Sequence, residues 1–594
     1  MTPDLFIASK ASEAIKAIYS AEIDPSALQV GVTRKEFEGD YTLVVFPLLK
    51  MSHTTPENTG KAIGDWLVAN VPEISGFNCV KGFLNILFSN LYWNELFAEI
   101  VSTPDFGYLP STGKNVMVEF SSPNTNKPLH LGHIRNNLLG DSVSRLLKAS
   151  GNNVIKTTIV NDRGIHICKS MLAWQKVGNG ATPESTGKKG DHLVGDMYVA
   201  FNDILKKEVE ALVAGGMDEE TAKKEAPCLK EAHEMLRKWE AGDPEVRDLW
   251  QRMNKWVLDG FDETYAALGI SFDKVYFESQ TYLLGKELVQ KGLDMGVFVR
   301  EADGSVWCDL TSDGLDRKLL LRSDGTSVYI TQDLGTAERR FAEYSLDSHV
   351  YVVGDEQNYH FQVLKLILRK LGFSWADAIY HLSYGMVELP EGKMKSREGT
   401  VVDADDLIEK MYQEAKATSE ESGKLDDMSE EEKERLYKMI GLGALKYFII
   451  KVDPKKTMLF NPKESIDFNG NTGPFIQYTH ARIRSILRKA SERGVAAAES
   501  VPSVELSSKE IRLIKLLNLF PSKVAEGAAA YSPAVIANYA YDLAKEFNQY
   551  YHETPILKEE DTSMLQARLL LIDTLSAVLR RAMGILGIEL PERM

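Results

Sequence analysis

The sequence VEFSSPNTNKPLHLGH, residues 118–133, decides the fold. It overlaps an apolar run, Val116–Phe120, which predicts a strand, and it continues through a polar loop. The apolar residues within Ile134–Leu147 then recur at helical spacing and predict a helix that opens at His130. Strand, loop and helix in this order are typical of a unit in an open α/β sheet, which binds ligands at the carboxyl edge of its strands.

A second apolar run, Val154–Val160, follows the helix stop at Gly151 and completes a strand–helix–strand unit. The helix amino terminus offers unpaired N–H groups and the positive end of the macrodipole, which together favour a phosphate group. Gly132 lets a ligand approach the backbone, and the nitrogen-bearing side chains that converge on this mouth are Lys127, His130 and His133. A lone His-x-Gly-His also occurs by chance, and its histidines are then usually structural hydrogen-bonding residues. Its placement here, at a strand-to-helix turn, favours a phosphate site.

The run from Phe120 to His133 resembles the first signature of the class I aminoacyl-tRNA synthetases, His-Ile-Gly-His. More narrowly, it resembles the arginyl enzymes, in which Phe-Ser-Ser-Pro-Asn-x-x-Lys-Pro-x-His-x-Gly-His is typical. The resemblance covers nearly the whole chain. It implies catalytic roles for Lys127, His130 and His133, and ATP contacts for His130, Leu131, Gly132 and His133.

The stretch GKMKSREGT, residues 392–400, resembles the second signature of the family, Lys-Met-Ser-Lys-Ser, with a departure. The usual place of the second lysine holds Ser396, and Lys395 comes one position early. Arginyl enzymes as a group relax this motif, and many carry a compensating lysine before the His-x-Gly-His, where Lys127 stands here. The resemblance implies a catalytic role for Lys395 and ATP contacts for Lys393, Met394, Ser396 and Arg397. Without the first signature, this stretch would be an exposed basic loop.

An arginine substrate needs a carboxylate partner, because guanidinium is a planar fork of donors that two oxygens match. The run Ser327–Thr331 predicts a strand that ends just before Asp333. A lone aspartate after a strand is more often a helix cap, and only the resemblance assigns the arginine side chain to Tyr329 and Asp333. It also implies that Asn124 and Gln357 contact the head of the amino acid, and the further candidates are Glu278 and, more weakly, Glu119.

Composition predicts an ordinary globular protein of three or four domains: the 594 residues are 44% hydrophobic and 26% charged. We find no apolar run of membrane-spanning length and no signal-peptide layout at the amino terminus. The four cysteines are scattered without a Cys-x-x-Cys pair, which favours a reducing, cytoplasmic location and disfavours a structural zinc. The net charge of −16 by itself disfavours nucleic-acid binding. However, local clusters of lysine and arginine, and not the total charge, determine the affinity for nucleic acid.

We expect three parts along the chain. Residues 1–112 predict a separate α/β domain, and residues 113–460 a doubly wound, Rossmann-like parallel sheet interrupted by an insertion at about 176–270. Residues 461–594 predict an all-α bundle. The resemblance implies that the first part contacts the tRNA corner, that the insertion guides the acceptor end, and that the bundle binds the anticodon. Most aromatic residues of the bundle are expected in its core, and the candidates for stacking or charge contacts with tRNA are Tyr478, Arg482, Arg484 and Arg488.

The resemblance implies an arginine–tRNA ligase, which activates L-arginine with ATP and Mg²⁺ to arginyl-AMP and transfers it to the 3′ end of tRNA(Arg). It further implies transfer to the 2′-hydroxyl, tRNA binding before activation, a monomer, and no metal site in the protein itself. Two alternatives stay open at this point. One is another class I synthetase such as the cysteinyl enzyme, which the cysteine spacing and the Tyr329–Asp333 pair disfavour. The other is a catalytically silent tRNA-binding protein, supported only by the altered second signature.

Overall fold

The structure is a computed structural model that describes residues 2–34, 36–388, 402–421 and 428–594. Its Cα positions form two compact units. The first unit comprises Met1–Phe106, Arg482–Phe520 and Lys545–Val578, and the second comprises Gly107–Ala481, Pro521–Ala544 and Leu579–Met594. All residues of the predicted phosphate and arginine sites fall within the sequence range of the second unit.

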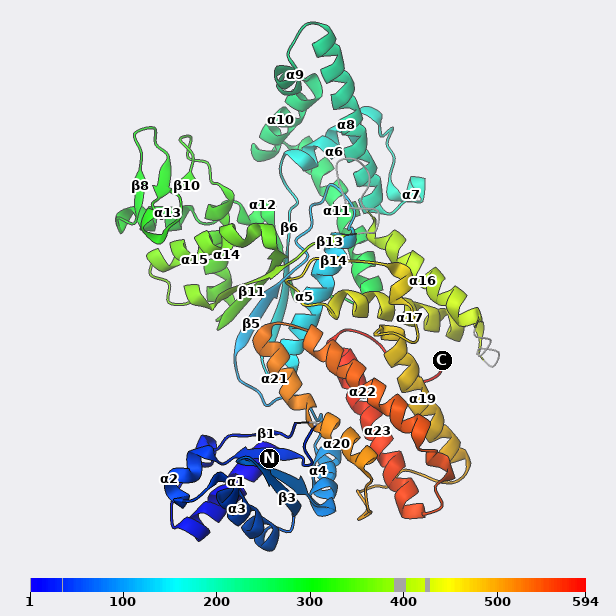
Figure 1. The fold of residues 1–594 in the computed structure, drawn as a ribbon. Coiled ribbons are helices and arrows are strands. Elements are labelled where there is room, and N and C mark those ends of the chain that lie inside the picture. The colour runs from blue at the N-terminus through cyan, green and yellow to red at the C-terminus, as the bar shows by residue number, and fades with distance from the viewer. Residues whose placement is uncertain (1, 35, 389–401, 422–427) are drawn as a thin grey trace. The chain divides into compact units, whose positions relative to one another are not determined.

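A five-stranded parallel sheet forms the centre of the second unit and confirms the predicted doubly wound architecture (Figure 1). The chain enters at the middle strand, builds one side of the sheet, and returns later to build the other. The strand order across the sheet is β12 (Ile379–Tyr384), β11 (Ser348–Gly354), β5 (Asn115–Glu119), β6 (Asn153–Val160) and β7 (Lys274–Phe277). The order therefore reverses between β5 and β11, which is where such sheets open a ligand crevice.

The strand–helix–strand unit predicted from the sequence is confirmed as β5, α5 (Leu131–Ala149) and β6. Helix α5 buries its apolar positions against the sheet. Gly140 makes this close approach possible, because a Cβ atom there would lie 2.1 Å from the ring of Phe120. Phe120, directly after β5, is thereby packed against the middle of α5.

The predicted strand Ser327–Thr331 is wrong, because helix α14 (Tyr329–Tyr344) begins inside it. The run has β-branched and aromatic residues, but burial of a helical stripe outweighs this local preference. That buried stripe consists of Ile330, Leu334, Ala337 and Phe341. Asp333 therefore lies in the second turn of a helix and does not follow a strand.

The insertion folds as helices, as its sequence predicts, but it begins with α6 at Ile165 and not at about 176. Its helices group together beyond the carboxyl end of β6 (Figure 1). They are α6 (Ile165–Val177), α7 (Pro183–Thr186), α8 (Gly190–Ala214), α9 (Glu219–Glu225), α10 (Pro227–Glu240) and α11 (Pro244–Leu268). Between β7 and α14 lies a small antiparallel sheet that the sequence analysis missed, with α12 (Glu278–Thr281), α13 (Lys286–Asp294), β8 (Phe298–Arg300), β9 (Val306–Cys308) and β10 (Lys318–Leu321).

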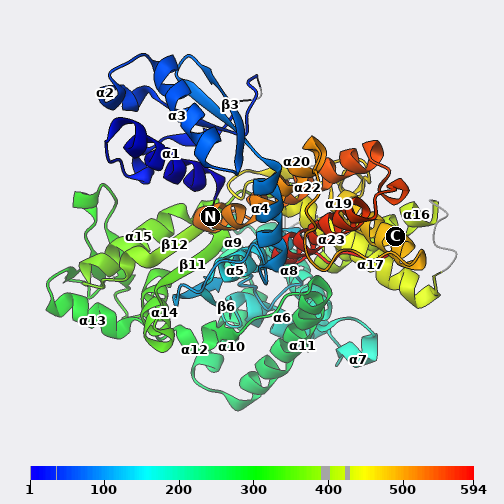
Figure 2. The ribbon, with the colours of Figure 1, turned by 90° about the horizontal axis from the view of Figure 1, so that it is seen from below.

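The amino-terminal segment of the first unit is an α/β fold with a four-stranded antiparallel sheet of order β1-β2-β4-β3. Helices α1 and α3 lie together beside this sheet (Figure 2). The elements are α1 (Pro3–Tyr19), β1 (Val30–Val32), β2 (Tyr41–Val44), α2 (Leu49–Ser52), α3 (Pro56–Asn70), β3 (Ile74–Val80), β4 (Phe83–Phe88) and α4 (Asn90–Ser102). Asn94 of α4 donates to the carbonyl of Val504 at 3.0 Å, so a late segment of the chain completes this unit.

The rest of the chain is largely helical, as predicted for its carboxyl-terminal part. Its elements are α15 (Asn358–Lys370), β13 (Val387–Glu388), α16 (Ala404–Glu421), α17 (Glu430–Ile450), β14 (Met458–Leu459), α18 (Pro462–Ser465), α19 (Gly473–Glu492), α20 (Ser508–Asn518), α21 (Phe520–Ala530), α22 (Ala534–Glu553) and α23 (Thr562–Ile585). One of them, α23, is long and apolar enough to cross a membrane, contrary to our expectation, and half of its apolar window is buried within the protein. Core helices share this composition.

Candidate active site

A cleft of about 1090 Å³ opens at the carboxyl end of the parallel sheet. The loops that follow β5, β6, β7 and β11 line it, together with helices α6, α8 and α14. Because the sheet order reverses between β5 and β11, these loops separate and leave room for a ligand. Fold and lining together make this cleft the candidate active site.

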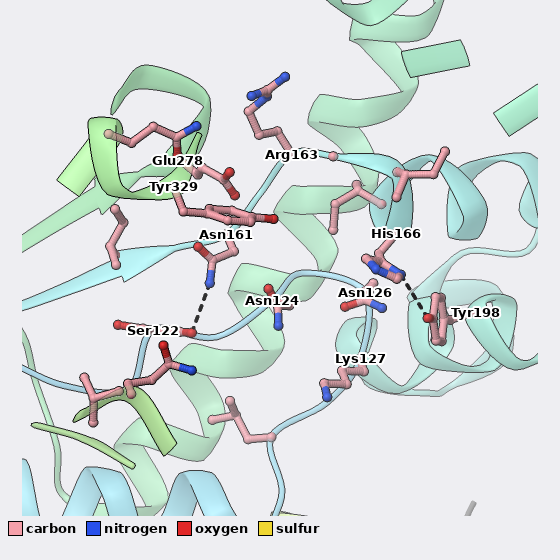
Figure 3. A pocket seen from close by; sticks show the side chains of 18 of the residues that line it. Ser122, Asn124, Asn126, Lys127, Asn161, Arg163, His166, Tyr198, Glu278 and Tyr329 are labelled. Atoms are coloured by element: carbon pink, nitrogen blue, oxygen red, sulfur yellow. Dashed lines mark hydrogen bonds between the residues drawn. The ribbon is translucent and has the colours of Figure 1, made fainter. Parts of the chain in front are cut away.

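The structure brings residues of both predicted sites into this one cleft, but Leu131, Gly132 and His133 are not among the residues that line it. Lys127 and His130 line it on the side of the phosphate site. The amino-acid candidates that line it are Glu119, Asn124, Glu278, Tyr329, Asp333 and Gln357. Figure 3 shows Glu278 and Tyr329 on one side, Asn124 in the middle of the view and Lys127 on the other side. The candidates Lys393, Met394, Lys395, Ser396 and Arg397 lie outside the described residues.

The loop between β5 and α5 has an uncommon backbone that specific side chains hold in place. Ser121 and Ser122 both have positive φ, 77° and 47°, a conformation that non-glycine residues adopt at a cost. The Ser121 N–H donates to Asn136 Oδ1 at 2.5 Å, and the Ser122 N–H donates to Thr158 Oγ1 at 3.1 Å. The hydroxyls of Ser121 and Tyr265 lie 2.7 Å apart. The loop is therefore set before any ligand binds.

Asn161, at the end of β6, ties the same loop to its neighbour. Its Nδ2 donates to the carbonyl of Ser122 at 3.2 Å, and its carbonyl accepts from the Thr125 N–H at 3.2 Å (Figure 3). Asn124 lies between these contacts and forms an isolated bridge with Asn161. Asn124 consequently reaches the cleft from a fixed backbone.

The two histidines of the first signature cap the start of α5. His130 Nδ1 accepts from the Gly132 N–H at 3.1 Å, and His133 Nδ1 accepts from the His130 N–H at 3.1 Å. Since each Nδ1 acts as an acceptor, the proton of each neutral ring is on Nε2. A Cβ at Gly132 would lie 3.0 Å from the His130 ring, so this glycine leaves room for the cap.

Burial disfavours the charged form of each of these nitrogen groups. It lowers the pKa of His130 to about 4, with a smaller contribution from the charge of Lys127. It also lowers the pKa of His133 well below its usual range and the pKa of Lys127 below that of a free lysine. At neutral pH both histidines are therefore neutral donors through Nε2.

The opposite side of the cleft is acidic. Asp333 Oδ2 lies 2.6 Å from Nε2 of His360, a residue that the sequence analysis missed. The sequence signal for His360 was only its position three residues after Gln357, which directly precedes α15. Burial raises the pKa of Glu278 to about 6, Arg163 opposes this shift, and Asp162 and Asp333 reinforce it. Tyr329 is 76% exposed and forms part of the cleft wall.

Glu119, at the end of β5, lines the cleft but already has a buried partner. Its carboxylate forms an ion pair with Arg340 of α14, whose guanidinium also lies 4.5 Å from the ring centroid of Tyr276. Burial raises the pKa of Glu119, and the charge of Arg340 opposes that shift. The structure thus gives Glu119 an internal cation, which makes it a weaker candidate for an external one.

Residues of the insertion also line the cleft, and the sequence analysis did not single them out. His166 Nδ1 lies 3.0 Å from the hydroxyl of Tyr198, and both face the cleft beside Lys127 and Asn126 (Figure 3). Their helices, α6 and α8, come together only through the fold of the insertion. Spacing in the sequence therefore carried no signal for this wall.

The residues predicted to bind tRNA lie on α19 and are not among the described residues that line the cleft. Arg482 donates to Asn548, and Arg484 donates to Asp573 at 3.0 Å. Tyr478 packs edge-on against Phe468, with ring centroids 6.4 Å apart. A tRNA contact through these residues and Arg488 stays a prediction.

Comparisons with known proteins bear on the family of this chain. Residues 102–461 match the family described as tRNA synthetases class I (R), catalytic domain, and residues 476–594 match the DALR anticodon binding domain. The chain is 59% identical over 583 residues to the arginine–tRNA ligase of Bacteroides thetaiotaomicron, covering 98% of each chain. It is 56% identical over 589 residues to that of Porphyromonas gingivalis, covering 99% of each.

Solved structures give the same result. The chain is similar to the arginyl-tRNA synthetase of Thermus thermophilus, with a TM-score of 0.78 and 26% identity over the full length of both chains. The arginyl-tRNA synthetase of Plasmodium falciparum has a TM-score of 0.71 at 19% identity, covering 99% of this chain and 98% of that one, and shows likeness of fold alone.

The capping geometry makes a prediction about His130. We expect its ring to stay neutral and Nε2-protonated from pH 5 to pH 8, because burial lowers its pKa to about 4. Nitrogen NMR of histidine-labelled protein, with His130→Asn for assignment, measures both the tautomer and the midpoint. A midpoint near 6.5, the value of a free histidine, would contradict the buried cap.

Proposed function

Because this chain belongs to the arginyl-tRNA synthetase family, we propose that its cleft joins L-arginine to ATP and passes the arginyl group to tRNA(Arg). The chain is an arginine–tRNA ligase by family, and its two-step reaction proceeds through arginyl-AMP. The main support for the site is one cleft that holds nitrogen donors at one side and carboxylates at the other. In this proposal a single adenylate spans both sides.

Activation needs stabilisation of charge more than proton transfer. A carboxylate oxygen of arginine attacks the α-phosphorus of ATP, an O–P bond forms, and the bond to the pyrophosphate oxygen breaks. The attacking carboxylate is already ionised, so no general base is required. Charge grows on the phosphate oxygens, where the Nε2–H groups of His130 and His133 and the ammonium of Lys127 are proposed to donate.

The proposed arginine slot pairs a planar cation with fixed acceptors. Asp333 is oriented by His360 at 2.6 Å, so it presents its carboxylate in a defined direction. Tyr329 and Glu278 complete the slot, while Asn124 and Gln357 are proposed to contact the amino and carboxylate groups of the substrate. Lysine would fail here because a single ammonium cannot satisfy two oxygens in one plane.

We propose that Mg²⁺ enters this cleft bound to ATP. Lys127 and His130 offer nitrogen donors, whereas Mg²⁺ prefers oxygen ligands, so the ion would be held by phosphates and water. Lys395 and the ATP contacts Lys393, Met394, Ser396 and Arg397 remain proposals from the family pattern. Lys127 is proposed to take the place of the displaced signature lysine.

The remaining roles are proposals from the family and the matched domains. We assign anticodon contact to the carboxyl-terminal helical part through Tyr478, Arg482, Arg484 and Arg488. Residues 1–112 are proposed to contact the tRNA corner, and the insertion to guide the acceptor end. A cytoplasmic monomer is the proposed form.

Arginine-dependent aminoacylation of total tRNA by the purified protein tests this function.

The variant Asp333→Asn tests the proposed arginine slot. We expect the variant to bind arginine more weakly by about thirtyfold or more, since removing one partner of a close charge pair costs about 2–5 kcal/mol. Equilibrium arginine titration measures this, with Asp377→Asn as the matched control, because Asp377 pairs with Arg369 on the surface. Unchanged arginine affinity in Asp333→Asn would remove that residue from the slot.

The raised pKa of Glu278 predicts that arginine affinity depends on pH. Below about pH 6 its carboxyl is protonated and must lose that proton to pair with guanidinium. We expect the affinity to fall as pH drops through 6, by up to about tenfold per pH unit. Calorimetric titrations from pH 5 to 7.5 measure this. Glu278→Gln is expected to bind weakly without this dependence, and equal pH dependence in both proteins would contradict the assignment.

Lys127→Ala is expected to slow activation by about 100-fold while changing arginine binding little, because its ammonium acts on the phosphates. Rapid measurement of pyrophosphate release, beside an arginine titration with tRNA present, separates the two effects. Lys176→Ala is the control, since Lys176 pairs with Glu231 within the insertion. Equal losses in both measurements would take Lys127 out of the catalytic set.

A further inference from the structure

A half-buried ion-pair network joins the start of α8, in the insertion, to the start of α16. The ammonium of Lys189 lies 2.5 Å from Asp405 Oδ2 and 2.6 Å from Thr264 Oγ1. The Thr264 hydroxyl donates to Asp405 Oδ1 at 2.8 Å, and His192 Nε2 lies 3.1 Å from Asp405 Oδ2. Asp405 is therefore held by three side chains from two helices of the insertion.

The segment that carries Asp405 is hydrogen-bonded to the turn that carries His130. The Leu131 N–H donates to the carbonyl of Val402, and the Ala404 N–H donates to the carbonyl of Leu129, each at 3.0 Å. Asp403 lies between these bonds, bridges with His130, and accepts from the Asp405 N–H at 2.8 Å. A displacement of Asp405 would consequently move the backbone partner of the ATP-binding turn.

Helix α8 also contacts this turn directly. A Cβ at Gly195 would lie 2.8 Å from Pro128 Cδ and 3.7 Å from the Cα of Lys127. A Cβ at Gly190 would lie 2.1 Å from the carbonyl oxygen of Trp256, so α8 is packed tightly on α11 as well. The first turns of α8 thus touch the phosphate side of the cleft both directly and through Asp405.

The network is a set of ion pairs and not a vacant cation site. Asp191, His192 and Asp405 present ligand atoms within 4.8 Å of one another, a spacing that suits a metal. The ammonium of Lys189 already lies 3.4 Å from Asp191 and 2.5 Å from Asp405, and supplies the positive charge. Burial raises the pKa of Asp405, but hydrogen bonds from His192 and Lys189 outweigh it and leave that pKa well below its usual range.

We propose that Lys189 is a positioning residue for ATP: it fixes Asp405, and through the 402–404 segment it fixes the turn that bears His130. This inference rests on the proposed ATP-dependent function. Lys189 itself does not line the cleft, so it would act on ATP only through the position of the turn that bears His130. A misplacement of catalytic groups by about 1 Å costs on the order of 100-fold in rate, which makes such an effect measurable.

The test is arginine-dependent pyrophosphate exchange with tRNA present, on the full chain. Lys189→Met is expected to raise the KM for ATP by about tenfold or more and to leave the KM for arginine within about twofold. Lys189→Arg keeps the charge and is expected to restore at least half of the loss. Lys255→Met is the matched control, because Lys255 pairs with Asp259 on the exposed face of α11.

A double-mutant cycle with Asp405→Asn makes the test sharper. Because the two residues act as one unit, the double variant is expected to lose no more than the worse single variant. Additive losses, an unchanged KM for ATP, or equal rises in the KM for ATP and for arginine would each overturn the proposal. Loss of arginine binding in Lys189→Met would do so too, since it would show a merely structural role. An unmodified protein without exchange activity would instead refute the proposed function.

Discussion

One buried amide side chain connects the parts on which the cleft depends. Asn136 of α5 accepts from the Ser121 N–H at 2.5 Å, and its Nδ2 donates to the carbonyl of Val352 at 2.8 Å and to the hydroxyl of Tyr384 at 3.1 Å. It thereby links the end of β5 to β11 and β12, across the point where the strand order reverses. A buried amide without hydrogen-bond partners destabilises the folded state. The folded state therefore favours this one arrangement, in which the Asn136 side chain keeps all three partners.

The electrostatics of the cleft follow from how deeply each group is buried. On the phosphate side, burial removes charge from His130 and His133 and leaves donors that need no deprotonation. On the other side, Glu119 is already paired with Arg340, so its carboxylate is not available to bind a cationic ligand. Asp333 and Glu278 are left to face the cleft. The nitrogen donors and the carboxylates therefore lie on different sides of one cleft, which is the separation that the proposed function requires.

The sequence was most informative where local preference and burial agree. The strand–helix–strand unit at 115–160 was predicted closely because its apolar spacing matches both its local structure and its buried faces. The strand predicted at 327–331 was wrong because the strand-forming residues there begin a helix and contribute to its buried stripe. His360 and Arg340 could not be found, since only tertiary contacts bring them to Asp333 and Glu119. The choice of Asp333 rested on family resemblance, because the physical argument alone favoured a helix cap.

The insertion lies inside the catalytic segment of the sequence, and the structure gives a physical reason for its position. It leaves the sheet directly after β6, so its helices start at the edge where the ligand binds. Gly195 brings α8 against Pro128, and His166 and Tyr198 extend the cleft wall beyond the sheet. The proposed phosphate side of the cleft is thereby bordered by a helical wall. Such a wall lowers the exposure of Lys127 and His130 to water, which strengthens charge interactions there.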